Sequence, residues 1–304
     1  MTTSAQARLA PCRVGVIGAG RVGAVLAAAL RARGHDVVAA HGVSDASQAR
    51  AADLLPGVPL EPVATVVEQA ELVLLAVPDD TLPGLVQGVA RSTGFRSDQV
   101  VAHTSGRHGV AVLAPAAAHG AVTMAVHPAM TFTGTARDLD RLNGTRFGVT
   151  ADPHHLDLAD ALVRELGGTS VHVAEPDRDL YHAALAHSAN HLVTLVADAR
   201  DLLTRAGVAD PAGTLRPLLQ AALDNALEQG SSALTGPVAR GDAGTVAAHL
   251  RAISTVDPDS GDLYAALARH TAARAVADGR LRAADAAGLM DVLAGLDTSQ
   301  TTSA

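Results

Sequence analysis

The sequence predicts an α/β chain in which a doubly wound parallel sheet is followed by an all-helical domain. Two observations support this prediction. Short apolar runs alternate with helical segments from residue 13 to residue 173, which is typical of a parallel sheet covered by helices. From Pro176 onward no strand pattern remains, and every long segment is helical. We therefore expect one domain at residues 12–175 and a second at residues 176–296.

The predicted strands of the first domain are residues 14–17, 36–40, 58–60, 72–77, 100–103, 122–126, 146–150 and 170–173, and the last two are expected to extend the far edge of the sheet. The predicted helices between them are residues 22–33, 44–55, 62–70, 81–90, 110–119 and 153–166, with Ser44 as an N-cap. In the second domain, Pro, Gly and Asp residues separate helices at residues 177–206, 211–228, 237–253, 260–278 and 283–293.

Three glycines between the first strand and the first helix form the pattern G-x-G-x-x-G, at Gly18, Gly20 and Gly23. The first permits a tight turn, the second lets the backbone approach a pyrophosphate, and the third allows the helix to pack closely on the strand. Phosphates would meet N–H groups at the positive end of the helix. This context predicts a dinucleotide-binding Rossmann domain, whose loop also contains Ala19, Arg21 and Val22.

The composition excludes several classes of function. The 304 residues have a formal net charge of −8 and no basic block, which argues against nucleic acid and membranes as partners. The single cysteine, Cys12, excludes an internal disulfide framework and favours the reducing cytoplasm. All 23 basic residues are arginine, so lysine is excluded from any mechanism. The helical domain is rich in alanine and poor in aromatics, and we expect it to form a homodimer.

The end of the second strand lacks the acidic residue with which NAD-binding domains hold the ribose hydroxyls. His41, Ser44 and Arg50 follow that strand instead, and these residue types suit a 2′-phosphate. We therefore expect NADP as the cofactor. Asp45 leaves NAD as an alternative, if its loop folds back toward the ribose.

Polar clusters follow three of the predicted strands, at the end of an open parallel sheet where ligands bind. Because His-Pro is a poor generic turn after a buried strand, we interpret His127 as a site residue. The segment from His103 to Gly106 is explained equally well as a loop or as part of a site. The cofactor contacts expected at the other two clusters are Ala76, Val77, Pro78, Asp80, Thr104 and Ser105.

Polar side chains also recur on one face of the first helix of the second domain. His187, Asn190 and His191 have the spacing i, i+3, i+4, which predicts the wall of a cleft. The two histidines have the spacing of metal ligands, but no neighbouring Cys or carboxylate completes a site, so no metal is expected. Further along, Thr235 suits an N-cap, while Arg240 suits a substrate or a partner subunit.

The segments AVPDD, HTSG, HPAMTFTG, YHAALAHSANH and LTGPVARGD together resemble an actinobacterial family. That family pairs a Rossmann-like NADP domain with a helical domain of unknown function, and the resemblance spans residues 12–293. The architecture is similar to that of 6-phosphogluconate, 3-hydroxyacid and prephenate dehydrogenases, ketopantoate reductase and pyrroline-5-carboxylate reductase. The resemblance implies that Asn190 matches a catalytic asparagine, that the catalytic lysine position falls at Ala186, and that Thr235 matches a substrate-binding serine.

The resemblance and the motifs predict a cytoplasmic NADP-dependent reductase of a small carbonyl compound, for which a 2-oxo acid such as ketopantoate is the best candidate. The expected catalytic residues are His127, His187, Asn190 and Ser105, and the expected substrate contacts are His103, Asn190, His191, Thr235 and Arg240. Either His127 or His187 would supply the proton, with Tyr181 or water as further sources. The alternatives are a cyclic imine reductase, an arogenate or prephenate dehydrogenase, and a non-catalytic NADP sensor.

Overall fold

The structure, a computed structural model, describes residues 9–294. Residue contacts divide the chain into two units, one ending at Asn190 and the other beginning at His191. This boundary lies inside the long helix α8, Arg178–Arg205, so the first turns of α8 belong to the unit that contains the sheet. The last two residues of the predicted second domain, 295 and 296, lie outside the described residues.

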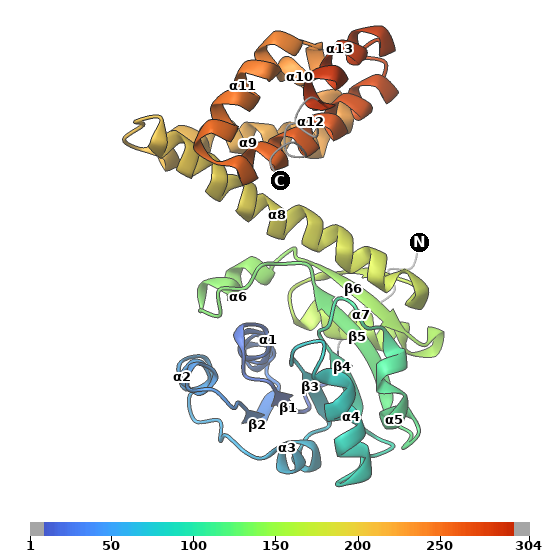
Figure 1. The fold of residues 1–304 in the computed structure, drawn as a ribbon. Coiled ribbons are helices and arrows are strands. Elements are labelled where there is room, and N and C mark those ends of the chain that lie inside the picture. The colour runs from blue at the N-terminus through green and yellow to red at the C-terminus, as the bar shows by residue number, and fades with distance from the viewer. Residues whose placement is uncertain (1–8, 295–304) are drawn as a thin grey trace, which may run out of the picture. The chain divides into compact units, whose positions relative to one another are not determined.

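A seven-stranded sheet in the order β2-β1-β3-β4-β5-β6-β7 forms the centre of the first unit (Figure 1). Its strands are β1 Arg13–Ile17, β2 Asp36–His41, β3 Leu72–Leu75, β4 Val100–His103, β5 Val122–Pro128, β6 Arg146–Ala151 and β7 Thr169–His172. The strands β1 to β5 are parallel. Strand β6 runs antiparallel to β5, and β7 is parallel to β6. The predicted fold class is confirmed, with one reversal of strand direction that the sequence pattern did not predict.

The strand predicted at residues 58–60 is reduced to a single parallel bridge between Leu60 and Ala40. Ala40 N donates to the Pro59 carbonyl at 3.0 Å, and Glu61 N donates to the Ala40 carbonyl at 2.9 Å. Pro59 and Pro62 have no backbone N–H, so a longer ladder cannot form here.

Helices cover both faces of the sheet because successive strand residues point to opposite sides. One core joins strand residues such as Val16 and Leu74 to α1 Arg21–Ala32, α2 Asp45–Leu54, α6 Arg137–Leu142 and α7 Leu156–Glu165. The other joins residues such as Ile17 and Leu75 to α3 Val63–Gln69, α4 Leu82–Arg91 and α5 Ala114–Ala117. The helix predicted at residues 110–119 is instead a 3₁₀ turn, Val110–Leu113, followed by the single turn of α5. Helix α6 was not predicted.

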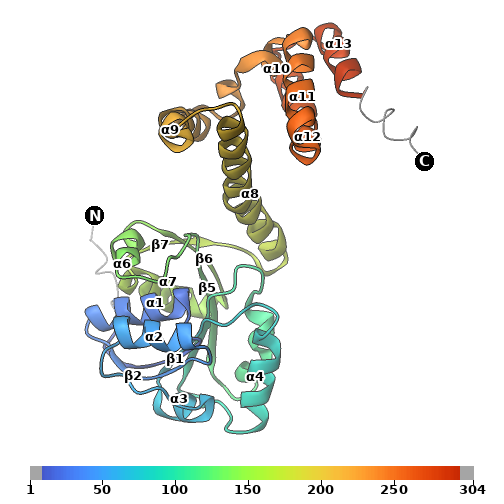
Figure 2. The same ribbon diagram turned by 60° about the vertical axis from the view of Figure 1, so that its left-hand side comes forward.

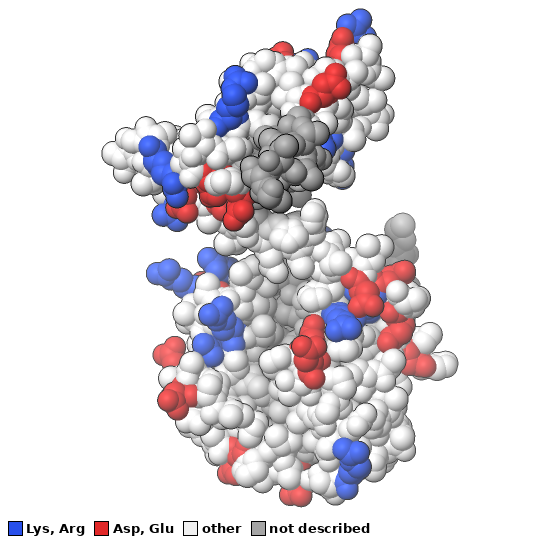
Figure 3. Space-filling view, in the orientation of Figure 1, with Lys and Arg blue, Asp and Glu red and all other residues white. Residues whose placement is uncertain are grey.

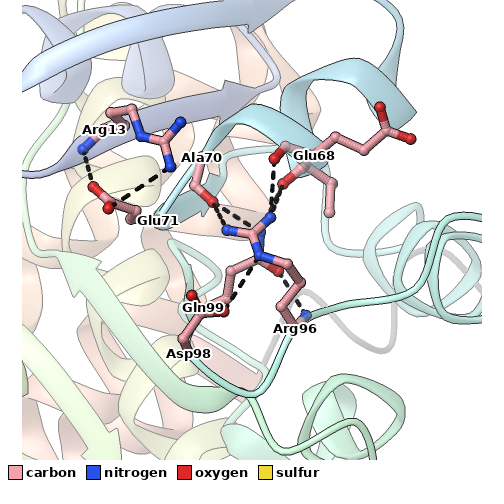
Figure 4. Close-up of polar contacts among 8 residues, drawn as sticks. Arg13, Glu68, Ala70, Glu71, Arg96, Asp98 and Gln99 are labelled. Atoms are coloured by element: carbon pink, nitrogen blue, oxygen red, sulfur yellow. Dashed lines mark hydrogen bonds and ion pairs between the residues drawn. The ribbon is translucent and has the colours of Figure 1, made fainter.

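Polar side chains close the amino ends of β1, β3 and β4 (Figure 4). Arg96 donates to the carbonyls of Glu68 at 2.9 Å and Ala70 at 2.8 Å, which lie at the end of α3. Gln99 is fully buried and also donates to the Ala70 carbonyl, at 2.9 Å. Because the last carbonyls of a helix have no partner inside it, these donors stabilise the end of α3.

The second unit is helical, with the end of α8 followed by α9 Pro211–Gln229, α10 Gly236–Arg240, α11 Ala243–Val256, α12 Pro258–Ala277 and α13 Ala283–Ala294 (Figure 2). The helix predicted at residues 237–253 is broken at Gly241, whose φ of 77° is left-handed, so α10 ends there. Within residues 9–294, no helix is long and apolar enough to cross a membrane.

The core of the second unit is built from small side chains. Helix α12 contributes Ala265, Ala268, Ala272 and Ala275, which we call the alanine seam, and the seam packs with leucines of α11 and α13. Helix α9 differs, because of its 19 residues only Leu215 is buried.

Candidate functional site

The glycine loop after β1 has the geometry expected from its sequence. Gly18 has a φ of 98°, and a Cβ built there would collide with the Ala76 carbonyl. A Cβ built at Gly23 would collide with the Gly18 carbonyl. Gly20 is different, because a Cβ there meets nothing within 4 Å. Two of the glycines are therefore required by packing, while Gly20 borders open space.

The first turn of α1 is available to an anion. No side chain caps this helix, whose N-cap is Gly20. The carbonyl of His41 accepts hydrogen bonds from Gly18 N at 3.0 Å and Ala19 N at 2.8 Å, which fixes the loop against β2. An uncapped helix N-terminus beside an open glycine is a site that a pyrophosphate fits. The residues present therefore fit a dinucleotide cofactor.

Loops from the neighbouring strands lie beside this turn. Ala76 N donates to the Ile17 carbonyl at 2.8 Å, and Thr104 N donates to the Leu75 carbonyl at 3.1 Å. These bonds extend the parallel pattern beyond β3 and β4, so the predicted cofactor contacts after both strands lie at the same edge as the glycine loop. Asp80 is highly exposed and lies 4.0 Å from Arg107.

Two of the residues predicted to meet a 2′-phosphate are engaged within the fold. The His41 ring nitrogen Nδ1 lies 2.8 Å from the Glu61 carbonyl. The Ser44 hydroxyl accepts from Ser47 N at 3.2 Å, which confirms Ser44 as the N-cap of α2.

Two arginines converge near the same place. A Cβ built at Gly134 would meet Arg50 Nε at 2.5 Å and Arg21 Cγ at 3.0 Å, so both side chains lie against this glycine. Arg21 begins α1, and Arg50 lies on α2. Basic side chains gather on this face of the first unit, close to α6 (Figure 3). The pair supplies positive charge beside the end of β2.

A buried carboxylate organises the loop that contains Gly134. Asp138 Oδ2 accepts from Gly134 N at 2.7 Å and Thr133 N at 2.8 Å, and Oδ1 accepts from the Thr133 hydroxyl at 3.0 Å. Burial raises the pKa of Asp138, but these hydrogen bonds together lower it below its usual value. Sequence analysis missed Asp138, although a T-x-T-x-x-D spacing is a signal for such a side-chain cap.

His103 is fully buried, and both of its ring nitrogens have partners. Its Nε2 lies 2.9 Å from the Gly109 carbonyl, and its Nδ1 accepts from Ser105 N at 3.2 Å. These partners fix a neutral ring with the proton on Nε2, and burial lowers the pKa of His103 to about 4. The Ser105 hydroxyl accepts from His108 N at 3.0 Å. We therefore do not retain the predicted substrate contact of His103.

His127 lies near the end of β5, beside a histidine that sequence analysis did not single out. The ring centroids of His127 and His182 are 5.8 Å apart, with the rings nearly perpendicular. A Cβ built at Gly106 would meet His182 Cδ2 at 2.5 Å and His127 Nε2 at 3.0 Å. The glycine of the HTSG segment thus leaves room for two imidazoles. Burial, then His182 and Arg178, lower the pKa of His127 to about 4, so the ring is neutral near pH 7.

A pocket of about 320 Å³ lies between the end of β5 and the first turns of α8, within the first unit. Its polar lining includes His127, His182 and Asn190, and Ala186 also lines it. Residues 182, 186 and 190 are four apart, so they form one stripe of α8. The structure brings the predicted His127 and Asn190 together. It also places Ala186, the position at which the resemblance puts a catalytic lysine, in the same lining.

The stripe predicted on α8 is rotated from the one that faces the pocket. His187 is exposed and does not line this pocket, and His191 lies beyond the boundary, in the second unit. His187 and Asn190 are neighbours on the helix surface, but their side chains differ in direction by about 60°. His182 lies about two turns before Asn190. The i, i+4, i+8 spacing of His182, Ala186 and Asn190 is the sequence signal that could have identified it.

Tyr181 contacts His127, and Arg178 lies over the ring of Tyr181. The Tyr181 hydroxyl is 3.0 Å from His127 Nδ1, and a Cβ at Gly148 would meet that hydroxyl at 2.5 Å. Arg178 is 1% exposed, and its Nη1 donates to the Gly148 carbonyl at 3.2 Å. Gly148 is the register partner of His127 across β5 and β6.

The remaining predicted substrate contacts belong to the second unit. Thr235 occupies the N-cap of α10, without a side-chain hydrogen bond to the helix. Arg240 pairs with Asp242, with Nη2 at 2.9 Å from Oδ2. Within residues 9–294, no group of three His, Cys, Asp or Glu side chains is arranged to hold a metal ion.

Two protein-family models match the sequence. One describes a Rossmann-like domain and covers residues 1–128, and the other describes a domain of unknown function (DUF2520) and covers residues 145–271. The Rossmann-like match therefore precedes the DUF2520 match along the chain. This finding confirms the pairing that the sequence motifs suggested. None of the curated proteins matches the sequence.

Several solved structures share the fold of this chain. A candidate NADP oxidoreductase of Bacteroides fragilis, BF3122, is 23% identical, with a TM-score of 0.74 over 86% of this chain and 98% of its own. Protein TM1727 of Thermotoga maritima is 20% identical, with a TM-score of 0.64 over 87% and 99%. An imine reductase of Pseudomonas sp. is 16% identical, with a TM-score of 0.61 over 86% and 93%. Because these identities are all below 25%, the similarity establishes a shared fold and nothing more specific.

Proposed function

We propose that this chain is an NADP-dependent oxidoreductase that reduces a small C=O or C=N compound. The observation that carries the proposal is a pocket lined by the neutral His127, at the same end of the sheet as the uncapped N-terminus of α1. Two of the structures that share the fold are described as an NADP oxidoreductase candidate and an imine reductase, which supports this class of reaction.

NADP is the proposed cofactor, with NAD as the alternative. The bound nicotinamide would supply a hydride to the substrate carbon. Gly18, Gly20 and the first turn of α1 would hold the pyrophosphate. Arg50 and Arg21 would meet the 2′-phosphate, because both lie against Gly134 beside the end of β2 and a guanidinium binds phosphate well.

His127 would donate the Nε2 proton to the heteroatom of the substrate, and Asn190 would orient that bond by hydrogen bonding. Both side chains line the pocket. A 2-oxo acid such as ketopantoate is the first substrate class to test. A cyclic imine is the second, because the residues that line the pocket include no arginine for a carboxylate.

The decisive experiment measures NADPH consumption with a panel of 2-oxo acids and cyclic imines. With an active substrate, His127→Ala should lower turnover by roughly 10²- to 10⁴-fold, the usual range for general acid catalysis, with NADPH affinity unchanged. The matched control is His187→Ala on the exposed side of α8, which should keep the parent turnover. A larger loss in His187→Ala would assign the proton to that residue. NADPH binding with no turnover on any compound would favour the sensor alternative.

We also propose that the chain is a cytoplasmic homodimer joined through its second unit. Leu223 and Leu227, one turn apart on α9, are 45% and 78% exposed, and a groove of about 340 Å³ lies between α8 and α9. An apolar helix face of this kind is typical of a subunit interface. Light scattering at micromolar concentration should return twice the chain mass, and the mass of a single chain would contradict the proposal.

A further inference from the structure

Each unit contains one hydrogen-bonded histidine–tyrosine pair of nearly the same geometry. In the first, His127 Nδ1 lies 3.0 Å from the Tyr181 hydroxyl, with ring centroids 5.7 Å apart at 89°. In the second, His249 Nδ1 lies 3.1 Å from the Tyr264 hydroxyl, with centroids 6.0 Å apart at 82°. The second pair is therefore a natural control for the first.

The pairs differ in what lies beside the tyrosine. The guanidinium carbon of Arg178 is 5.8 Å from the centroid of the Tyr181 ring. Arg178 is 1% exposed, its Nε donates to the His108 carbonyl at 3.0 Å, and its Nη2 has no hydrogen-bond partner in the described part of the chain. A buried cation that donates hydrogen bonds to neutral backbone carbonyls favours nearby negative charge.

The charge of Arg178 acts on Tyr181 as this geometry suggests. Burial, the largest influence, raises the pKa of Tyr181 above its usual value, and Arg178 and a hydrogen bond from the Gly148 backbone oppose this shift only in part. For Tyr264, burial raises the pKa and no cation opposes it. The groups that act on His127 are His182 and Arg178 of α8 and Asp79 after β3.

We propose that Tyr181 is the proton source behind His127, and that Arg178 stabilises the tyrosinate left after proton transfer. This inference rests on the proposed reductase function. It assigns to Tyr181, His127 and Arg178 the role that the lysine-equivalent Ala186 cannot perform. His127 touches the substrate, and Tyr181 and Arg178 act through His127.

The proton steps balance as follows. The bound dinucleotide would supply a hydride to the substrate carbon, and the substrate heteroatom would take the proton from His127 Nε2. As Nε2 loses its proton, the Tyr181 hydroxyl proton moves to His127 Nδ1, so the imidazole stays neutral and a tyrosinate forms beside Arg178. A solvent proton added at Nε2 lets Nδ1 return its proton to Tyr181. The sum is one hydride and one proton added across the C=O or C=N bond, with the dinucleotide oxidised.

We call the transfer of protons from Tyr181 through His127 to the substrate the relay. It requires that, in the resting chain, the Tyr181 hydroxyl donates its hydrogen bond to Nδ1 of His127. Nitrogen-15 NMR of histidine-labelled protein, without substrate, reports the tautomer of each ring. We expect His127 with its proton on Nε2, and a shift toward a mixture of tautomers in Tyr181→Phe. A His127 ring protonated on Nδ1 in the parent chain would overturn the relay. Tyr181→Phe loses only a hydroxyl, so its folding is expected to match the parent.

The role of Arg178 is tested by ultraviolet titration of tyrosinate. The chain has two tyrosines and no tryptophan, so Tyr264→Phe leaves Tyr181 as the sole absorbing phenol. In that background, Arg178→Gln should raise the Tyr181 pKa by about one unit or more relative to Arg178→Lys, which keeps the charge. Equal pKa values in the two variants would remove Arg178 from the mechanism. In a Tyr181→Phe background, neither Arg178 variant should move the Tyr264 pKa.

Measurements of kcat distinguish a failure of the relay from a failure of the proposed function. Tyr181→Phe should lower kcat by about 10- to 100-fold with KM and NADPH affinity unchanged, since the relay acts only on proton transfer. Tyr264→Phe should keep the parent kcat. A parent kcat in Tyr181→Phe overturns the relay alone. A parent chain that binds NADPH and reduces no compound overturns the proposed function alone. The tautomer and titration results would still decide whether Tyr181 donates to His127 and whether Arg178 stabilises the tyrosinate.

Discussion

The two ends of the central sheet use their polar groups in opposite ways. At the amino end, Arg96 and Gln99 donate to the last carbonyls of α3, so a helix end that lacks partners is closed by the protein itself (Figure 4). At the carboxyl end, the first turn of α1 has no side-chain cap, and His127 lines a pocket. The polar groups at the amino end therefore stabilise the fold, whereas those at the carboxyl end are available to a ligand.

The largest effect should come from the glycine that borders open space. Gly20→Val should weaken NADPH binding by at least about 100-fold, because a branched side chain would occupy the place of the pyrophosphate. Urea unfolding should show little loss of stability, since a Cβ at this position meets nothing within 4 Å. Isothermal titration calorimetry measures the binding.

The matched substitution at the other end is Gln99→Leu. It leaves the Val67 and Ala70 carbonyls without their donor from Gln99, so the free energy of unfolding should fall by about 1–3 kcal/mol. NADPH affinity should stay at the parent value. If Gly20→Val unfolds the chain, or if Gln99→Leu weakens NADPH binding in a chain that remains folded, the division between the two ends is wrong.

His103 lies at the carboxyl end of the sheet, yet it is fully buried and both of its ring nitrogens have partners within the fold. Its pKa is about 4 in the folded chain, against 6.5 for an ordinary histidine, so the unfolded chain binds more protons between these pH values. Stability should therefore fall as the pH drops from 6.5 to 4, by up to about 3 kcal/mol from this residue. Urea unfolding at a series of pH values measures the slope.

The control for this pH dependence is His103→Gln, whose amide can still donate to the Gly109 carbonyl but does not titrate. This variant should lose part of the acid sensitivity between pH 6.5 and 4. An unchanged slope would show that His103 is not the group that takes up the proton on unfolding.

The smallest effect concerns the choice of nucleotide. Arg50→Ala should weaken NADPH binding by about tenfold, the value of one charge-assisted hydrogen bond, and leave NADH binding unchanged. Arg13→Ala at the amino end, where Arg13 pairs with Glu71 at 3.7 Å, should alter neither affinity. Tighter binding of NADH than of NADPH by the parent chain would contradict the proposed cofactor.

Most of the first unit could be predicted from its sequence because apolar periodicity and glycine spacing are local signals. The strands β1 to β5 and the N-cap at Ser44 follow from such signals. The reversal at β6 could not be predicted, since strand direction depends on how the connection runs in space. Helix α6 was missed because its sequence, RDLDRL, is polar, and its buried Asp138 acts through backbone hydrogen bonds.

The candidate site could be predicted only in part. His127 and Asn190 share one pocket, as expected, and both were identified by motif. His182 and Arg178 were missed because their significance comes from contacts with β5 and β6, which are distant in sequence. His187 was proposed because the resemblance placed it next to the empty lysine position, whereas the direction of a helix face depends on what the helix packs against.

The alanine seam of α12 limits how the second unit can vary over evolutionary time. Its four alanines are almost fully buried, so a larger side chain at any of them must push neighbouring helices apart. Glycine removes only one methyl group and costs about 1 kcal/mol of helix stability at each position. A smaller side chain is therefore tolerated in the alanine seam better than a larger one. Sequence drift in this unit should concentrate on the outer faces of its helices, while the spacing between α11, α12 and α13 stays nearly constant.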